Sequence, residues 1–307
     1  MSAGTGLANQ AELSASAAEA PRSPAAVTLR RFRKHKLAVI SAVFLILLFL
    51  VAIFAPIVAP HDPNQQDLQL AQFGQPASPQ LNHPMGSDQL GRDTLSRLIH
   101  GSRVSLLVGF IATGVAIVIG TILGAIAGYT GRWTDMIIMR LADMMLAFPP
   151  LLFLMAVLVA VPRTALNIAI VIGIIGWMNV ARLVRAEFLV LRTREYTEAA
   201  RAIGVSPTSI MFRELLPNAM GPVIVAATLG IPTAILAEST LSFLGFGIQP
   251  PLASWGNMLE PAWSQMRDHN AWWMGLFPGL AIALTVLAFN FVGDGIRDAL
   301  DPRSRLD

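Results

Sequence analysis

Residues 104 to 128 read VSLLVGFIATGVAIVIGTILGAIAG, a run without a single charged side chain. Because an α-helix rises about 1.5 Å per residue, ~20 apolar residues cross the ~30 Å hydrocarbon layer of a bilayer. The run therefore predicts a membrane-spanning helix. Its glycines at Gly120, Gly124 and Gly128 recur at every fourth position, which places them on one helix face. Small residues at this spacing let a second helix approach closely, so we expect this face to pack against another helix rather than lipid.

The composition of the whole chain agrees with a membrane protein. Of its 307 residues, 54% are hydrophobic and only 13% are charged, whereas about a quarter are charged in soluble domains. The absence of cysteine excludes disulfides, thiolate nucleophiles and cysteine-based metal sites. The net charge of +3 and the lack of a basic run interleaved with aromatic residues give no reason to expect a nucleic-acid partner. The five histidines are far apart in the sequence, so we expect scattered polar residues and no metal site.

Five further apolar runs bring the expected number of spans to six, which predicts an all-α membrane protein. The first run follows a basic cluster at residues 30–36; a cleaved signal peptide would have a shorter apolar region and basic residues close to residue 1. The third span is interrupted by Phe148-Pro149-Pro150, and its charged first half offers Arg140 and Asp143 as an i, i+3 pair at the membrane edge. The five further runs cover residues 37–59, 133–161, 166–180, 220–243 and 276–292.

The distribution of Lys and Arg predicts that both termini are cytoplasmic. With six spans and an internal N-terminus, all but five of the 22 basic residues fall on the inner side. Five spans would place the C-terminal arginines outside and weaken this asymmetry. The five on the outer side are Arg92, Arg97, Arg103, Arg163 and Arg267.

These observations divide the chain into three regions. Residues 1–29, rich in Ala and Ser, are expected to form a disordered cytoplasmic tail. Residues 30–102 hold the first transmembrane helix and a polar periplasmic segment. Residues 103–302 form the transmembrane domain with spans two to six, and they include a cytoplasmic segment at 182–217 that is too long for a hairpin loop.

This cytoplasmic segment predicts two short helices joined by a glycine. The first begins near Glu195, and Gly204 follows it in the position of a helix C-terminal glycine. Ser206 is a candidate N-cap with Pro207 at the first helical position, and Pro217 is expected to end the second helix. The residues alone leave two interpretations open: a rigid protrusion that docks into a partner, or an amphipathic helix lying among lipid headgroups.

Three elements of this segment resemble the EAA motif of the permeases of binding-protein-dependent ABC importers. They are Glu198-Ala199-Ala200, then Gly204, then Leu216-Pro217-Asn218. In that family the motif forms the coupling helix, which fits a cleft on the ATP-binding subunit, so the resemblance favours the docking interpretation. The residues to which it assigns coupling are Glu195, Glu198, Ala199, Ala200, Arg201, Gly204, Leu216 and Pro217.

Further stretches resemble one subfamily, the C-type permeases for dipeptides, oligopeptides and nickel. They are GSDQLGRD at residues 86–93, LSFLGFGIQPP at 241–251, Trp255-Gly256, and FNFVGDGIRDALDP at 289–302. The resemblance covers roughly residues 30 to 302 and implies a type I ABC importer permease fold in the cell inner membrane. It implies a pore subunit that moves dipeptides or short oligopeptides from periplasm to cytoplasm by alternating access.

The resemblance also implies the partners: a second homologous permease, two ATP-binding subunits and a periplasmic or lipid-anchored substrate-binding protein. The chain has no G-x-x-x-x-G-K-[ST] loop, so we expect no enzyme and no cofactor here, with ATP and Mg²⁺ on the partner subunits. A secondary transporter would need paired intramembrane carboxylates or internal repeats. An intramembrane enzyme would need a nucleophile–base pair or a metal cluster within the spans. Neither pattern is present in the sequence.

Four residues outside the coupling segment have two readings each. Glu238 in the fifth span is either pore-lining or a hydrogen-bonded structural carboxylate, and we favour the latter. Pro232 in the same span is expected to kink the helix. Kinked helices line translocation paths in transporters, and they also occur as plain packing features. Trp255 and Trp263 lie in a loop after this span, either as membrane-interface anchors or as docking residues for the substrate-binding protein.

Overall fold

The computed structural model describes residues 24–67, 69–71 and 74–300, and across these it consists of helices and loops without a β-strand. The predicted tail at residues 1–29 lies outside the described residues as far as residue 23, but residues 24–29 already belong to a helix. In chain order the helices are α2 (Pro24–Lys34), α3 (Lys36–Ile53), α4 (Ala55–Val58), α5 (Thr94–Thr130), α6 (Arg132–Leu146), α7 (Pro150–Val159), α8 (Ala165–Leu191), α9 (Glu195–Ala202), α10 (Pro207–Ser209), the π-helix η2 (Ile210–Leu215), α11 (Leu216–Phe243), α12 (Trp255–Leu259), α13 (Ala262–His269) and α14 (Trp273–Leu300).

Five of these helices are long and apolar enough to cross a membrane alone: α3, α5, α8, α14 and the continuous helix from Pro207 to Phe243. The sixth expected span is α6 followed by α7, which bend by 87° at the break between them. Pro149 and Pro150 explain this break, because proline lacks a backbone donor and restricts the residue before it to extended conformations. The count of six therefore holds when the bent pair is taken as one span.

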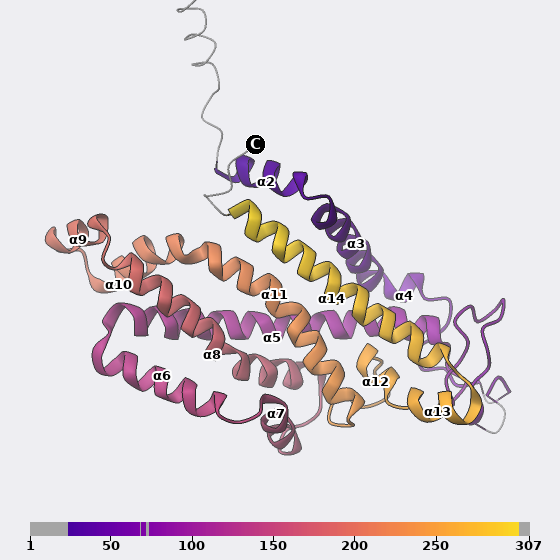
Figure 1. Ribbon diagram of the computed structural model, residues 1–307. Coiled ribbons are helices and arrows are strands. Elements are labelled where there is room, and N and C mark those ends of the chain that lie inside the picture. Colours follow the sequence, from indigo (N-terminus) through magenta and orange to yellow (C-terminus); the bar gives the residue numbers. More distant parts are fainter. Residues whose placement is uncertain (1–23, 68, 72–73, 301–307) are drawn as a thin grey trace, which may run out of the picture.

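Helix α5 lies at the centre of the structure, and α8 packs along it (Figure 1). A Cβ atom added to Gly120, Gly124 or Gly128 would lie only 2.5–2.6 Å from atoms of α8. Real Cβ atoms essentially never have contacts this short, so only glycine allows the two backbones to approach so closely. The glycine face predicted from the sequence is thus confirmed as a helix-packing face.

Ion pairs connect α6 to α8 near the end where α9 lies. The guanidinium of Arg185 donates two hydrogen bonds to the carboxylate of Asp135, one of them 2.6 Å long, and Arg182 pairs with Asp143. The sequence predicted instead that Asp143 would pair with Arg140 on its own helix. That prediction is wrong because the partner comes from α8, 39 residues away in the chain, which an i, i+3 rule does not consider.

The two ends of the helical bundle are formed by different segments of the chain. Helix α9 lies at one end, and α12, α13 and the segment that precedes α5 lie at the other (Figure 1). Helix α2 packs against the C-terminal part of α14, at the end of this helix that is far from α13. Helix α9 and the polar segment before α5 therefore face opposite sides of the membrane that the long helices would cross.

Candidate coupling segment and central pocket

Helix α9 presents one face to the protein and the other to solvent. On the inner face Thr197 is fully buried, and its hydroxyl donates a hydrogen bond of 2.9 Å to the carbonyl of Leu191. Ala200 packs against an apolar cluster formed by α5, α8, η2 and α11. The guanidinium of Arg201 lies 5.3 Å from the centre of the Tyr129 ring, a cation–π contact that ties α9 to the end of α5.

The outer face of α9 is exposed and mostly small or apolar. Its residues are Glu195, Glu198, Ala199, Ala202 and Ile203. Ile203 is 81% exposed, although an isoleucine side chain is normally buried. The sequence prediction named neither this residue nor Thr197. The sequence does carry a signal for Ile203, which is an apolar residue directly before the glycine that ends the helix. In this position it lies at the end of the protruding helix.

The turn after α9 is a Schellman motif, as the predicted position of Gly204 requires. The N–H of Val205 bonds to the carbonyl of Ala200 at 3.1 Å, and the N–H of Gly204 bonds to that of Arg201 at 3.0 Å. Gly204 has a φ of +80°, which L-residues with a side chain rarely adopt. Ser206 then caps the next helix by accepting a bond from the N–H of Ser209, with Pro207 at its start.

The predicted stop at Pro217 is wrong. The helix that begins at Pro207 continues through the π-helical turn η2 into α11 and ends only at Phe243. In a π-helical turn the N–H of Leu216 bonds to the carbonyl of Met211, five residues back. This wider turn leaves room for the Pro217 ring, whose missing donor would interrupt a regular α-helix. Leu216 is partly buried against the same apolar cluster as Ala200, and Pro217 is exposed.

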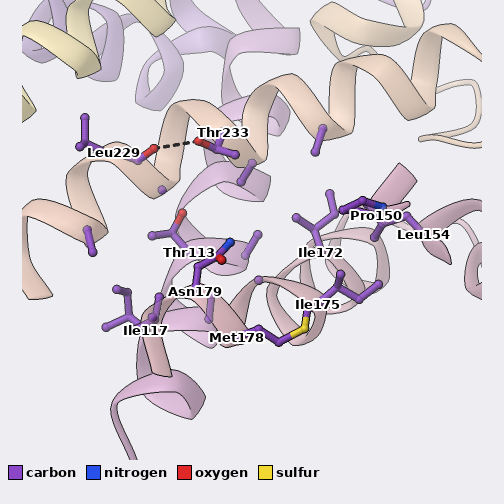
Figure 2. A pocket seen from close by; sticks show the side chains of 18 of the residues that line it. Thr113, Ile117, Pro150, Leu154, Ile172, Ile175, Met178, Asn179, Leu229 and Thr233 are labelled. Carbon is purple, nitrogen blue, oxygen red and sulfur yellow. Dashed lines mark hydrogen bonds between the residues drawn. The ribbon is translucent and has the colours of Figure 1, made fainter. Parts of the chain in front are cut away.

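A cavity of about 580 Å³ lies between α5, α7, α8 and α11, near the middle of the bundle (Figure 2). Its lining is apolar except for a few side chains, among them Thr113, Asn179 and Thr233. The Thr233 hydroxyl bonds to the carbonyl of Leu229 within α11, and the buried Thr113 hydroxyl has no hydrogen-bond partner. A cavity with few convergent polar groups is the usual form of a small-molecule path or site.

The two residues predicted to line a pore do not border this cavity. Glu238 is fully buried and accepts hydrogen bonds from Ser242 at 2.7 Å and from Ser254 at 2.9 Å, with Ser239 at 3.5 Å. Pro232 is also buried, inside a helix that continues on both sides of it. The hydrogen bonds match the structural reading of Glu238, with Ser242 and Ser254 as partners that the sequence did not suggest.

The two tryptophans predicted as docking residues differ in exposure. Trp255 is 1% exposed, its indole N–H donates to the carbonyl of Leu98 at 3.1 Å, and its backbone N–H donates to Ser105. This burial assigns Trp255 to packing between α12 and α5 and corrects the docking prediction for it. Trp263 on α13 is 70% exposed and has a free surface to offer a partner.

The expectation that the histidines are scattered is wrong for two of the five. His61 and His83, 22 residues apart in the chain, have stacked rings with centroids 4.6 Å apart, beside Asp93. The segment between α4 and α5 folds back on the first turn of α5, and this return places them together. A prediction from the spacing of residues along the chain does not include such contacts between distant segments.

The fold and these sites define an integral membrane permease with a helix that protrudes at one end. A family model described as the inner membrane component of binding-protein-dependent transport systems matches residues 120–306, and one for the N-terminal transmembrane domain of oligopeptide transport permease C matches residues 23–79. The chain belongs to the family of inner membrane components of binding-protein-dependent transport systems, and it is a multi-pass inner-membrane protein.

Similar proteins from several bacteria cover nearly the whole chain. The dipeptide transport system permease protein of Alkalihalophilus pseudofirmus is 41% identical over 92% of this chain and 91% of its own length. The oligopeptide transport system permease protein of Bacillus subtilis is 40% identical over 90% and 88%, respectively. The di/tripeptide transport system permease protein of Pseudomonas aeruginosa is 42% identical over 92% and 93%.

Proposed function

We propose that this chain is one of two pore-forming permease subunits of an ATP-driven importer for dipeptides or short oligopeptides. The observation that carries the proposal is α9, a helix held rigidly at one end of the bundle with an exposed outer face. The names of the similar permeases, which transport dipeptides, di/tripeptides and oligopeptides, support the choice of substrate class.

In this proposal α9 couples the permease to ATP hydrolysis on two separate subunits, which carry ATP and Mg²⁺. The chain itself takes no cofactor for transport and catalyses no reaction. The inner face of α9 is fixed by Thr197, Ala200 and Arg201. A movement of α9 would therefore be transmitted to α5 and α8 and would not be absorbed by a flexible loop. A second permease would complete the pore, and a periplasmic or lipid-anchored binding protein would deliver the peptide.

The orientation follows from the same proposal. Helix α9 and both termini would lie in the cytoplasm, as the distribution of Lys and Arg predicts. The segment before α5 and helices α12 and α13 would then lie on the periplasmic side. Trp263 on α13 is the exposed candidate for contact with the binding protein.

The experiment is to express the chain with its partner subunits, purify it from mild detergent through an affinity tag, and quantify the ATPases that remain bound. Ile203→Ser should release the ATPases, because it removes the exposed apolar side chain at the tip of α9. Ile137→Ser is the matched control, since Ile137 is a 64% exposed isoleucine on α6, away from α9. Full retention of the ATPases by Ile203→Ser would contradict the docking role and favour a helix that lies among lipid headgroups.

A further inference from the structure

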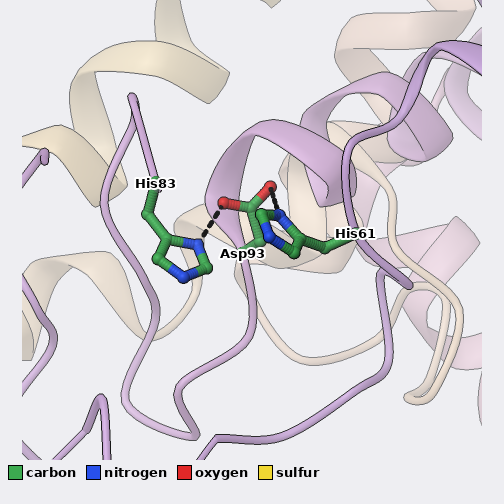
Figure 3. A group of neighbouring side chains, drawn as sticks. All are labelled: His61, His83 and Asp93. Carbon is green, nitrogen blue, oxygen red and sulfur yellow. Dashed lines mark hydrogen bonds and ion pairs between the residues drawn. The ribbon is translucent and has the colours of Figure 1, made fainter. Parts of the chain in front are cut away.

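His61, His83 and Asp93 converge at the start of α5, at the end of the molecule opposite α9 (Figures 1 and 3). One ligand atom from each, a histidine nitrogen or a carboxylate oxygen, lies within 4.8 Å of the other two. Nδ1 of His83 lies 2.9 Å from Oδ1 of Asp93, and Nδ1 of His61 lies 3.8 Å from Oδ2 of the same carboxylate. Both imidazoles thus direct the same nitrogen toward one carboxylate, as Figure 3 shows.

Nδ1 of His61 is the unexplained atom of this cluster. It is shielded from solvent and has no hydrogen-bond partner, although buried polar atoms are nearly always bonded. The carboxylate oxygen beside it, Oδ2 of Asp93 at 3.8 Å, already accepts a bond of 2.7 Å from the N–H of Ser96. A neutral imidazole nitrogen without a hydrogen-bond partner can offer its lone pair to a metal ion.

The backbone around the cluster is held in place at all three residues. The N–H of His61 donates to the Ser96 hydroxyl at 3.0 Å, and His83 exchanges two backbone bonds with Gln80. Asp93 is the N-cap of α5, which fixes its carboxylate. Held in this way, the three side chains can bind an ion without ordering a flexible loop first, which lowers the entropy cost of binding.

The neighbouring cations do not compete for Asp93. Arg92 donates to Asp88 at 2.6 Å, and the Nε of Arg97 lies 3.7 Å from the same carboxylate. Both arginines are thus directed to Asp88, and the carboxylate of Asp93 lies against the two histidines and the N–H of Ser96. In a tetrahedral zinc site the bonds are about 2.0–2.2 Å, so ligand atoms lie about 3.3 Å apart. The two distances to the Asp93 carboxylate, 2.9 Å from His83 and 3.8 Å from His61, lie on either side of this spacing.

We propose that His61, His83 and Asp93 form a binding site for a divalent transition-metal ion such as Zn²⁺, with water as the remaining ligand. Two imidazoles and one carboxylate are the donor set that borderline-soft divalent ions prefer. The ion would clamp the segment after α4 to the first turn of α5. The site is independent of the proposed transport function, because binding can be measured without transport.

The test is a titration of the permease with its partner subunits, in lipid nanodiscs and without nucleotide, purified through a tag that contains no histidine. Zn²⁺ is titrated in competition with a chromophoric chelator. His61→Phe should weaken the tightest Zn²⁺ site by at least about tenfold while it keeps an aromatic ring stacked on His83. Asp93→Asn should do the same and still cap α5, because asparagine is also a good N-cap.

The matched control is His100→Gln, which removes a histidine one helical turn from Ser96 but outside the cluster, and it should leave the affinity unchanged. Co²⁺ in place of Zn²⁺ should give the visible spectrum of a tetrahedral ion in the unmodified protein and in His100→Gln. Equal Zn²⁺ affinity in His61→Phe and the unmodified protein would overturn the proposal. So would a loss in His100→Gln as large as that in His61→Phe.

Discussion

Ser254, in the loop before α12, donates a hydrogen bond of 2.9 Å to the buried carboxylate of Glu238 in α11. Ser242, one turn further along α11, donates a second bond of 2.7 Å to the same oxygen. The backbone of the neighbouring residue Trp255 donates to Ser105 of α5. One carboxylate thus connects the C-terminal end of α11 to the loop that packs on α5.

Replacement of Glu238 should therefore harm stability more than transport by the folded protein. Glu238→Ala leaves two buried hydroxyls without an acceptor, at a cost of about 1–3 kcal/mol for each unsatisfied group. Glu238→Gln keeps an acceptor oxygen and should be milder. The measurements are the thermal midpoint of the purified protein and the rate of peptide uptake divided by the amount of permease in the membrane.

A pore-lining role for Glu238 makes the opposite prediction. Glu238→Gln would then reduce uptake per folded molecule with the thermal midpoint unchanged. The two readings are separated by this one variant, because it removes the charge and keeps the shape.

The close approach of α5 and α8 depends on glycine at particular positions. A Cβ on Gly124 would lie 2.5 Å from the carbonyl oxygen of Ala181, so Gly124→Ala should destabilise the protein by about 1–3 kcal/mol, the typical cost of overpacking. Gly114, in the same helix, has no atom within 4 Å of an added Cβ. Gly114→Ala should be neutral or stabilising by up to about 1 kcal/mol, because alanine favours helix. Thermal unfolding of both variants tests this, and equal effects would contradict it.

The two ion pairs between α6 and α8 should differ in strength. The Asp135 side chain is 17% exposed and takes two bonds from Arg185, whereas the side chains of Asp143 and Arg182 are about half exposed. Exposed pairs contribute about 0.2–1 kcal/mol, and shielded two-pronged pairs contribute more. Double-mutant cycles with Asp135→Asn and Arg185→Gln, and with Asp143→Asn and Arg182→Gln, should give the larger coupling energy for the first pair. Increasing salt should weaken the second pair more. A larger coupling energy for the second pair would contradict this order.

The parts of the fold that the sequence predicted are those governed by local pattern. Apolar length located the spans, and the spacing of Gly120, Gly124 and Gly128 located a packing face. The N-cap at Ser206 and the glycine end at Gly204 were recognisable because their chemistry involves neighbours within six residues.

Contacts between distant segments could not be predicted in this way. Asp143 meets Arg182, Glu238 meets Ser254, and His61 meets His83 only after the chain has folded. The continuation of the helix through Pro217 was missed for another reason. A proline normally ends a helix, and the π-helical turn that accommodates it depends on packing of Ile210 and Leu215 in the apolar cluster.

The turn that ends α9 depends on the left-handed backbone conformation of Gly204. Gly204 has a φ of +80° and no neighbouring atom within 4 Å of an added Cβ, so a substitution there acts through the backbone alone. A residue with a side chain costs roughly 1–2 kcal/mol in this conformation, and asparagine costs least. Gly204→Val should therefore disturb the Schellman turn and reduce both bound ATPase and peptide-stimulated ATP hydrolysis, with the chain still in the membrane. Gly204→Asn should retain most of both. If valine and asparagine reduced ATPase binding equally, the side chain itself would be blocking a surface against which the partner packs, and the backbone explanation would be wrong.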